Sequence, residues 1–266
     1  MAIAESTRKQ ALHPFRDLPT PTGWKHTEGE YVTACLHPVP IAQVIEPKEI
    51  RLADIEAAVA ESRAIVGDSG SSVLIWWLDP DHSWLGEHLE RCGLVNDETP
   101  GFEATENAMA LMHAPLGEVS ADIDVELVKT FEDFAAAERV QAAVFGMNEA
   151  DDRDGEAELA HRYEQYITPS NPLRQFNARF DGRVVGTASA VAGDGGLNLF
   201  GGSVLPEARG RGAYRALIQA RWALAVEYGT PWLTVQAGRM SRPIVERAGF
   251  EFLAPVLVYV DDLAPH

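Results

Sequence analysis

The sequence predicts an α+β (mixed α/β) protein in two similar domains, with a central, mostly antiparallel mixed sheet flanked by helices. Short apolar runs bounded by turn residues alternate with segments of helical periodicity. One unit also occurs twice, because the apolar runs VLIWWL and WLTV are each followed by a short helical segment ending in a Glu-Arg-X-Gly sequence. Leu78 lies 15 residues before Gly93, and Val235 lies 14 residues before Gly249. Duplication explains this match, and the alternative is coincidence of a common strand–helix unit.

The first half begins with an irregular arm over 1–24 that contains three prolines and has room for one short helix. The elements expected after it are a strand at 30–36, a helix at 53–66, a buried strand at 73–78, a short helix at 84–92 and a strand at 102–113. The alanines and methionines of the last segment equally allow a helix. A Pro-, Gly- and Ser-containing stretch at 114–121 is typical of a linker, so we expect domains at 1–115 and 116–266.

The second half repeats the alternation of strands and helices. Its expected strands lie at 125–128, 173–180, 183–192, 197–205 and 232–235. One expected helix runs from Thr130 to about 145, a second follows the acidic run and ends at about 166, and two more lie at 213–228 and 241–248. The chain ends in a stretch at 250–260. Thr130 is a candidate N-cap because its hydroxyl can accept a hydrogen bond from the first turn. Asp181-Gly182 is a typical two-residue hairpin turn.

The stretch from Asn198 to Tyr228 combines a strand, a glycine-containing turn and the start of a long helix. The sequence Arg209-Gly210-Arg211-Gly212 precedes an apolar stripe formed by Ala213, Leu217, Ala220, Leu224 and Tyr228. The first amides of a helix lack internal partners and carry partial positive charge, and glycine lets a ligand approach the backbone. The residues therefore predict a site for a pyrophosphate group.

Composition limits the classes of function. The net charge of −18 argues against nucleic acid as a partner, because phosphate backbones require a basic surface. Cys35 and Cys92 are too few for a disulfide framework. No stretch has the length and apolarity of a membrane span, and the N-terminus has no apolar signal segment, so we expect a cytoplasmic protein without membrane or metal partners.

Residues 122–262 resemble the GNAT acetyl-CoA-dependent acetyltransferases. The family hallmark, Q/R-x-x-G-x-G/A, corresponds to the segment from Arg209 to Tyr214. Pro206, the order of elements and the later Glu-Arg-Ala-Gly-Phe sequence add to the resemblance. The first half resembles a second, degenerate GNAT copy without a glycine loop of its own.

The resemblance implies a site for acetyl-CoA as cosubstrate, with no metal. The backbone of Val204 would hold a pantetheine amide, and the N–H of Gly202 would point at the thioester carbonyl. Pyrophosphate would bind the backbone amides of Arg211, Gly212, Ala213 and Tyr214, next to Gly210, with further ion pairs from the side chains of Arg209, Arg211 or Arg215.

Three positions depart from the family pattern and leave the catalytic residues unassigned. Val245 stands where the family has a tyrosine that acts as general acid. Gly238 stands where an asparagine often holds pantetheine, and Asn198 occupies the region that often supplies an acidic base. The sixth position of the hallmark is the bulky Tyr214. Ser241, Tyr259, His161, Tyr163 and Asp194 are candidate polar groups, each with a structural role as the alternative.

The expected activity is transfer of an acetyl group from acetyl-CoA to a primary amine of a small acceptor by direct attack. The acidic run at 149–158 favours a cationic acceptor, with a solvated loop as its alternative. A catalytically silent acyl-CoA-binding sensor or interaction protein remains open, since Val245, Gly238 and Asn198 fit that role. The resemblance is compatible with a monomer or a homodimer.

Overall fold

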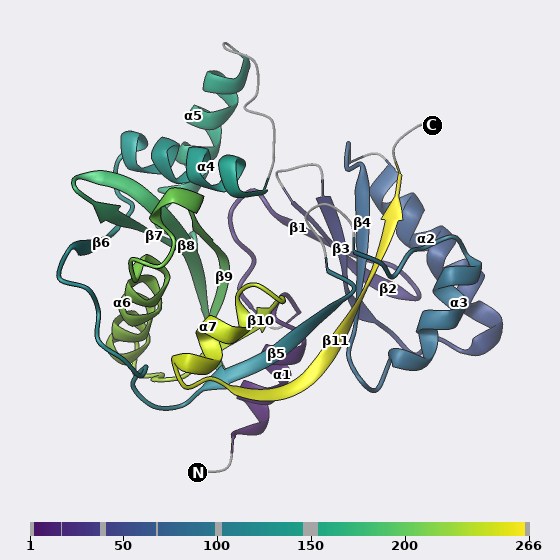
Figure 1. Ribbon diagram of the computed structural model, residues 1–266. Helices are drawn as coiled ribbons and strands as arrows, with labels where there is room; N and C mark the ends of the chain where they lie inside the picture. The colour runs from purple at the N-terminus through teal and green to yellow at the C-terminus, as the bar shows by residue number, and fades with distance from the viewer. Residues whose placement is uncertain are drawn as a thin grey trace.

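The structure, a computed structural model, describes residues 3–16, 18–37, 41–67, 69–98, 103–145 and 154–263. In these residues a single eleven-stranded mixed sheet runs through the molecule in the order β1-β2-β3-β4-β11-β5-β10-β9-β8-β7-β6 (Figure 1). Residues 149–153 of the acidic run at 149–158 lie outside the described residues, and the remaining five begin a helix.

The first half contains five strands and three helices within the described residues. They are α1 (Glu5–Leu12), β1 (Lys25–Glu28), β2 (Val32–Leu36), β3 (Ile41–Pro47), α2 (Ile55–Gly67), β4 (Val73–Leu78), α3 (Gly86–Arg91) and β5 (Thr105–Leu111). The predicted strand at 73–78 and the short helix in the N-terminal arm are confirmed, and the segment at 102–113 forms a strand. The sequence analysis missed β1 and β3, whose polar or proline-containing sequences show no clear alternation.

The described residues of the second half contain six strands and four helices. They are β6 (Ile123–Leu127), α4 (Phe131–Phe145), α5 (Asp154–Tyr166), β7 (Leu173–Phe180), β8 (Arg183–Gly193), β9 (Gly196–Val204), α6 (Ala213–Glu227), β10 (Leu233–Ala237), α7 (Arg242–Arg247) and β11 (Glu251–Asp262). The Thr130 cap is confirmed, since the Asp133 N–H donates to its hydroxyl at 3.1 Å. The hairpin turn is also confirmed, with φ of 49° at Asp181 and 72° at Gly182.

The two halves exchange their last strands at the centre of the sheet. β5, from the first half, lies between β10 and β11, while β11, from the second half, lies between β4 and β5 (Figure 1). Each half also has one parallel pair, β3 with β4 and β9 with β10. The sheet is therefore nearly symmetric about the β5–β11 pair, which supports the duplication seen in the sequence. The final stretch expected at 250–260 forms one long strand, β11.

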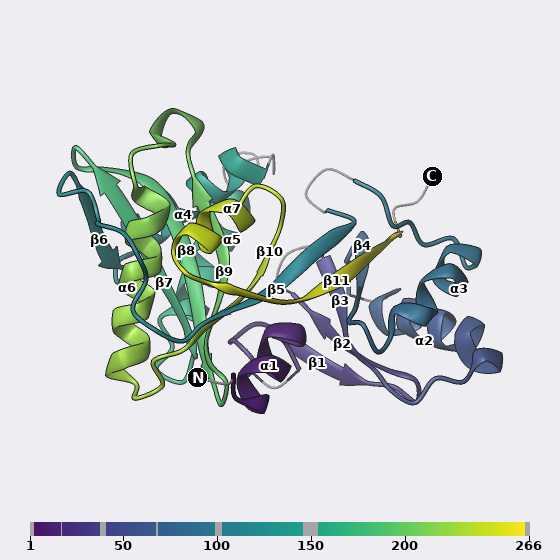
Figure 2. The same cartoon turned by 60° about the horizontal axis from the view of Figure 1, so that its bottom comes forward.

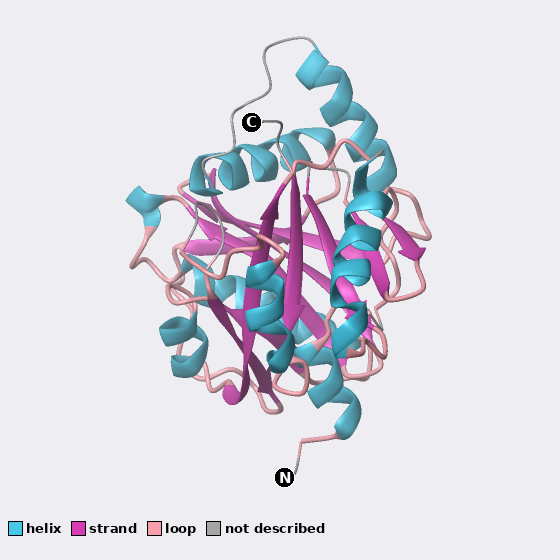
Figure 3. Ribbon diagram, turned by 90° about the vertical axis from the view of Figure 1, so that its right-hand side faces the viewer, coloured by secondary structure: helices cyan, strands magenta, loops and turns pink. Residues whose placement is uncertain are grey.

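The helices cover the two faces of the second half unequally. α6 and α7 pack on one face, where Leu217, Ile218 and Val245 join core residues of the strands. α1, α4 and α5 lie on the opposite face, where Ala11 packs on Ala108 and Val256. Figure 2 shows α1 beneath the central strands, and Figure 3 shows helices on the outside of the sheet. The two faces above the β9–β10 junction are thus built from different elements.

A buried aspartate connects the end of α1 to the end of β4. Asp79 accepts hydrogen bonds from His13 Nε2 at 2.7 Å and from His82 Nδ1 at 2.8 Å, and its side chain is 5% exposed. Burial alone would raise the pKa of Asp79, but the hydrogen bonds from His13 and His82 outweigh it and hold this pKa well below its usual range. The same hydrogen bond raises the pKa of His82.

We expect Asp79→Asn to destabilise the fold in a pH-dependent manner. Because the pKa of Asp79 is lowered in the folded state, its contribution to stability is present above its pKa in the unfolded chain, about 4. Because the pKa of His82 is raised, its contribution is fully present below its unfolded pKa of about 6.5 and is lost at higher pH. The cluster therefore contributes most between about pH 4 and 6.5. The substitution should cost about 2 kcal/mol at a pH of about 6, because it leaves a buried partner unpaired. The cost should shrink at a pH of about 8.5. Urea unfolding at both pH values measures it, and an equal cost at both would contradict this assignment.

Candidate functional site

β9 and β10 separate partway along their length. Their parallel register extends from Leu233 opposite Leu197 to Val235 opposite Leu199 and ends there. β9 nevertheless continues to Val204, and β10 continues to Ala237 paired only with β5. The last residues of β9, from Phe200 onward, therefore have an edge that no described strand pairs with. This opening, from Phe200 to Val204, is called the β9 splay below.

A β-bulge in β9 coincides with the splay. Gly201 and Gly202 stand opposite the single residue Ala188 of β8, and Gly201 has a φ of 62°. Such a bulge bends a strand and increases its twist, which separates it from its neighbour. Arg221 of α6, only 1% exposed, donates from Nη1 to the carbonyl of Ser189 beside the bulge at 3.3 Å. The bulge at Gly201 and Gly202 thus accompanies the opening.

The backbone of Val204 faces this opening. The N–H of Leu205 donates to the Val185 carbonyl at 2.9 Å, and alternate residues of an antiparallel ladder direct their polar groups to opposite edges. The N–H and C=O of Val204 therefore point away from β8. Its carbonyl accepts a long hydrogen bond of 3.4 Å from Arg209 Nε. Val204 has the orientation that the predicted pantetheine contact requires.

The predicted glycine loop leads directly into α6. Gly210 and Gly212 have φ values of 78° and 91°, a region that disfavours other residues, and Gly212 is the N-cap. No side chain caps this helix, and its first turn contains no acidic residue. The N–H groups of Ala213, Tyr214 and Arg215 precede the first intrahelical bond, from Ala216 to Gly212. A Cβ at Gly210 would meet no atom within 4 Å, so the loop surface there is open to a ligand.

The three arginines of this region contact neutral groups. Arg209 reaches the Val204 carbonyl, and the Arg211 guanidinium lies 4.6 Å from the centre of the Phe180 ring. Arg215 donates to the Glu118 carbonyl of the linker at 3.2 Å. Within the described residues, none of the three forms an ion pair with a carboxylate. Their positive charges are therefore not neutralised near the N-terminus of α6.

The Tyr214 side chain extends from the first turn of α6 to Gly202 at the β9 splay. A Cβ at Gly202 would lie 3.0 Å from Tyr214 Cε2 and 3.1 Å from its hydroxyl oxygen. Ser241, the N-cap of α7, lies near the hydroxyl and acts to lower its pKa, against the larger effect of burial. Burial raises the pKa of Tyr214, so the phenol is protonated at neutral pH. The backbone N–H of Tyr214 stays in the first turn of α6, while its side chain covers the splay from the α6 face.

The residues that depart from the family pattern have structural roles. Val245 is 1% exposed in the apolar core beneath α7. A Cβ at Gly238 would lie 2.9 Å from the carboxyl carbon of Glu103, which accepts a hydrogen bond from the N–H of Arg239. Asn198 accepts a hydrogen bond from Thr234, which in turn binds Gln10 of α1. Glu103 of the first half therefore fills the space that an asparagine side chain would need at 238.

Only one of the five candidate polar groups lies at the splay. Ser241 contacts Tyr214 there. The hydroxyl of Tyr163 donates to the Lys129 carbonyl, and His161 binds Gln165 on the surface. Tyr259 is buried in the core of the first half, and Asp194 lies in the β8–β9 turn, at the opposite end of β9.

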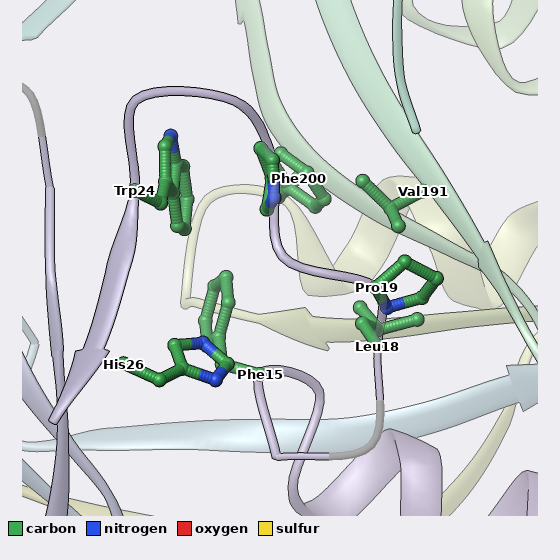
Figure 4. Close-up of a pocket in the computed structure, with 8 residues that line it drawn as sticks. Phe15, Leu18, Pro19, Trp24, His26, Val191 and Phe200 are labelled. Carbon is green, nitrogen blue, oxygen red and sulfur yellow. The ribbon is translucent and has the colours of Figure 1, made fainter. Parts of the chain in front are cut away.

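An apolar hollow lies beside the splay on the sheet face away from α6. Phe200, two residues before Gly202, lines it together with Phe15 and Trp24 of the N-terminal arm (Figure 4). The ring centres of these residues lie 5.8 to 6.5 Å apart. His26 also lines it, and the ring of the neighbouring His37 lies 3.9 Å from that of Trp24, tilted by 43°. Burial lowers the pKa of His26 and lowers that of His37 to about 4. Sequence patterns missed this hollow, because its members come from the arm and from β9.

Comparisons with known proteins agree with this geometry. A GCN5-related N-acetyltransferase from Kribbella flavida superposes with a TM-score of 0.66 over 98% of this chain and 96% of its own, at 17% identity. This chain has the GNAT fold. Residues 143–250 match the sequence model of the Acetyltransferase (GNAT) family. A tandem GNAT protein from the clavulanic acid biosynthesis pathway, solved without AcCoA, aligns over all of this chain and 90% of its own at 14% identity, with a TM-score of 0.60.

The GNAT resemblance inferred from the sequence is therefore confirmed, as is the arrangement in two GNAT-like domains. A search of curated protein sequences found no match. Among the described residues of this chain, no group of three or more His, Cys, Asp or Glu side chains is placed to hold a metal ion. No described helix has both the length and the apolarity needed to cross a membrane.

Proposed function

We propose that this protein transfers an acetyl group from acetyl-CoA to the amine of a small acceptor, and that domain 116–266 binds the acetyl-CoA. The observation that carries this proposal is the β9 splay, which leaves the backbone of Val204 facing an opening beside the free N–H groups of α6. Gly202 and Val204 would bind the thioester and pantetheine, and Gly210 to Tyr214 would bind pyrophosphate. Arg209 would release the Val204 carbonyl and, with Arg211, add positive charge.

Acetyl-CoA would supply an activated acetyl group on a thiolate leaving group. A donor at Gly202 toward the carbonyl oxygen is typically worth about 3 kcal/mol to the transition state. The Tyr214 hydroxyl lies beside Gly202 and is protonated at neutral pH. It can therefore donate a proton, which the Val245 side chain cannot. We propose that it donates a hydrogen bond to the sulfur, which then takes up its proton as the carbon–sulfur bond breaks.

The acceptor would bind on the face away from α6, because Tyr214 and α7 cover the other face of the splay. Phe15, Trp24 and Phe200 give this face an apolar surface, which favours an acceptor that carries an apolar group near its amine, although the hollow between them, about 10 Å³, would have to widen to admit that group. The cationic acceptor expected from the acidic run remains a prediction of the sequence.

The main alternative is an acyl-CoA-binding protein without turnover. The position of the Tyr214 ring favours this role without turnover, because the ring lies at the opening that the thioester would enter. This role would make Tyr214 a barrier rather than a proton donor.

Thiol release from acetyl-CoA with a panel of amines distinguishes the two roles. The panel includes arylalkylamines, branched aliphatic amines, polyamines and an aminoglycoside, and calorimetry measures CoA binding in parallel. We expect CoA binding and turnover, with the amines that carry apolar groups preferred. CoA binding without turnover of any amine would support the silent role, and the absence of CoA binding would contradict both.

A further inference from the structure

Glu106 of β5 is an acidic side chain at the centre of the sheet that the proposed function has not used. Its partner across the strands is Val256 of β11, and the next residue on the same face of β5 is Ala108. Both Val256 and Ala108 pack against Ala11 of α1. Because side chains alternate along a strand, Glu106 points to the α1 face. This is the face from which an acceptor would approach the splay.

The strand registers place Glu106 level with the splay. Asn107 pairs with Ala237, so the next residues along, Glu106 and Gly238, face each other. Leu199 pairs with Val235 in parallel, and the bulge at Gly201 and Gly202 occupies one position of this register. Ser203 is therefore level with Gly238, and Gly202 lies one position before it. Two strand spacings amount to about 10 Å, to which the splay adds. An amine between the two residues is therefore within reach of the Glu106 side chain, directly or through one water.

The surroundings of Glu106 suit a proton acceptor. Its side chain keeps partial exposure, and the protein around it, together with the negative charge of Glu103, raises its pKa to about 8. Within the described residues, its carboxylate has no hydrogen-bonded or ion-paired partner. It is therefore recessed but accessible, with a pKa suited to general base catalysis near neutral pH.

Other charged groups near β5 have partners of their own. Arg239 follows β10 and pairs with Glu98 at 3.6 Å, and Arg242 of α7 reaches Asn107 on the opposite face. On the α1 side, His13 and His82 bind Asp79. Among the described residues, Glu103 is the charged group that acts on the Glu106 carboxylate and raises its pKa, after the larger effect of burial.

We propose that Glu106, supplied by the first half of the chain, is the general base for the acceptor amine in the acetyl-transfer site of the second half. This inference rests on the proposed function. Glu106 accepts a proton from the acceptor ammonium group and releases it to solvent. The amine lone pair then forms the nitrogen–carbon bond while the carbon–sulfur bond breaks and its electrons leave on sulfur. After the attack, nitrogen loses its second proton, and sulfur gains one proton from the Tyr214 hydroxyl. The second proton from nitrogen then restores the hydroxyl of Tyr214, so the protons balance.

The test compares wild type with Glu106→Gln, Glu106→Asp and Glu103→Gln, using acetyl-CoA and the amine panel over a range of pH. In wild type, kcat/KM should rise with pH through a pKa near 8. Glu106→Gln should lose at least about 100-fold at neutral pH and shift this rise toward the pKa of the free amine. Glu106→Asp should recover part of the loss. Glu103→Gln should move the rise to lower pH, because it removes the charge that raises the pKa of Glu106.

Two controls separate this role from a structural one. Glu251→Gln changes an exposed carboxylate at the other end of the neighbouring β11 and should leave the profile unchanged. The carboxyl carbon resonance of Glu106, identified by its loss in Glu106→Gln, should titrate near 8 in the unliganded protein.

Each result bears on the proposal. An unchanged rate and pH profile in Glu106→Gln, or an ordinary carboxyl pKa for Glu106, would overturn it while leaving the proposed function in place. CoA binding by calorimetry without turnover of any amine would overturn both the base and the transfer activity, but not the CoA site. Failure of wild type to bind CoA would overturn the whole scheme.

Discussion

Gly212→Val is expected to weaken CoA binding by at least about 30-fold. Gly212 has a φ of 91° and directs the chain into α6, so a β-branched residue there is strained and should displace the first amides of the helix. The strain itself should lower stability by about 2 kcal/mol. Calorimetry at a temperature well below the unfolding transition measures the change in affinity.

Gly229→Val is the matched control at the opposite end of the same helix. Gly229 has a φ of 75°, and a Cβ there meets no atom within 4 Å. The substitution should lower stability by a similar amount without changing CoA affinity. Equal loss of affinity in both variants would show that CoA binding depends on helix stability rather than on the loop.

Tyr214→Phe is expected to reduce kcat by about 100-fold at neutral pH while CoA affinity changes less than about threefold. The substitution keeps the ring against Gly202 but removes the hydroxyl beside the expected sulfur position. A hydrogen bond to a thiolate lowers the pKa of the thiol, so its loss should raise the pKa of the bound CoA thiol by about one unit. The ultraviolet absorbance of the thiolate, followed against pH, reports this shift without an acceptor.

Tyr228→Phe serves as the control, because Tyr228 lies at the C-terminal end of α6 and is 43% exposed. It should change neither kcat nor the thiol titration. If Tyr214→Phe left the bound thiol unchanged and Tyr214→Ala tightened CoA binding, Tyr214 would be a barrier in the splay, as the silent role requires.

Local sequence patterns predicted the elements of the second half well. Asp181-Gly182, Thr130 and the glycines at 210 and 212 have roles set by backbone geometry, and each behaves as local rules require. The strands β1 and β3 were missed because their own residues carry little strand signal, although both pair with the neighbouring strand β2.

The exchange of β5 and β11 could not be predicted, because it depends on which strand edges meet in space. It brings Glu103 to Gly238, which explains the missing asparagine, and it places Glu106 within one position of the level of Gly202. Neither glutamate belongs to a recognisable motif. Similarly, the Tyr214 side chain could have pointed to solvent or behind the helix, and only the packing of α7 and Gly202 decides its position.

The most direct test of the CoA site is a titration of the isotope-labelled protein with CoA, followed through its backbone amide resonances. We predict that the largest shifts occur at Gly202, Val204 and the residues from Gly210 to Tyr214. The corresponding parallel pair of the first half, β3 and β4, should show no comparable change. The absence of saturable shifts, or shifts concentrated on β3 and β4, would contradict the assignment of the β9 splay and the α6 N-terminus as the acetyl-CoA site.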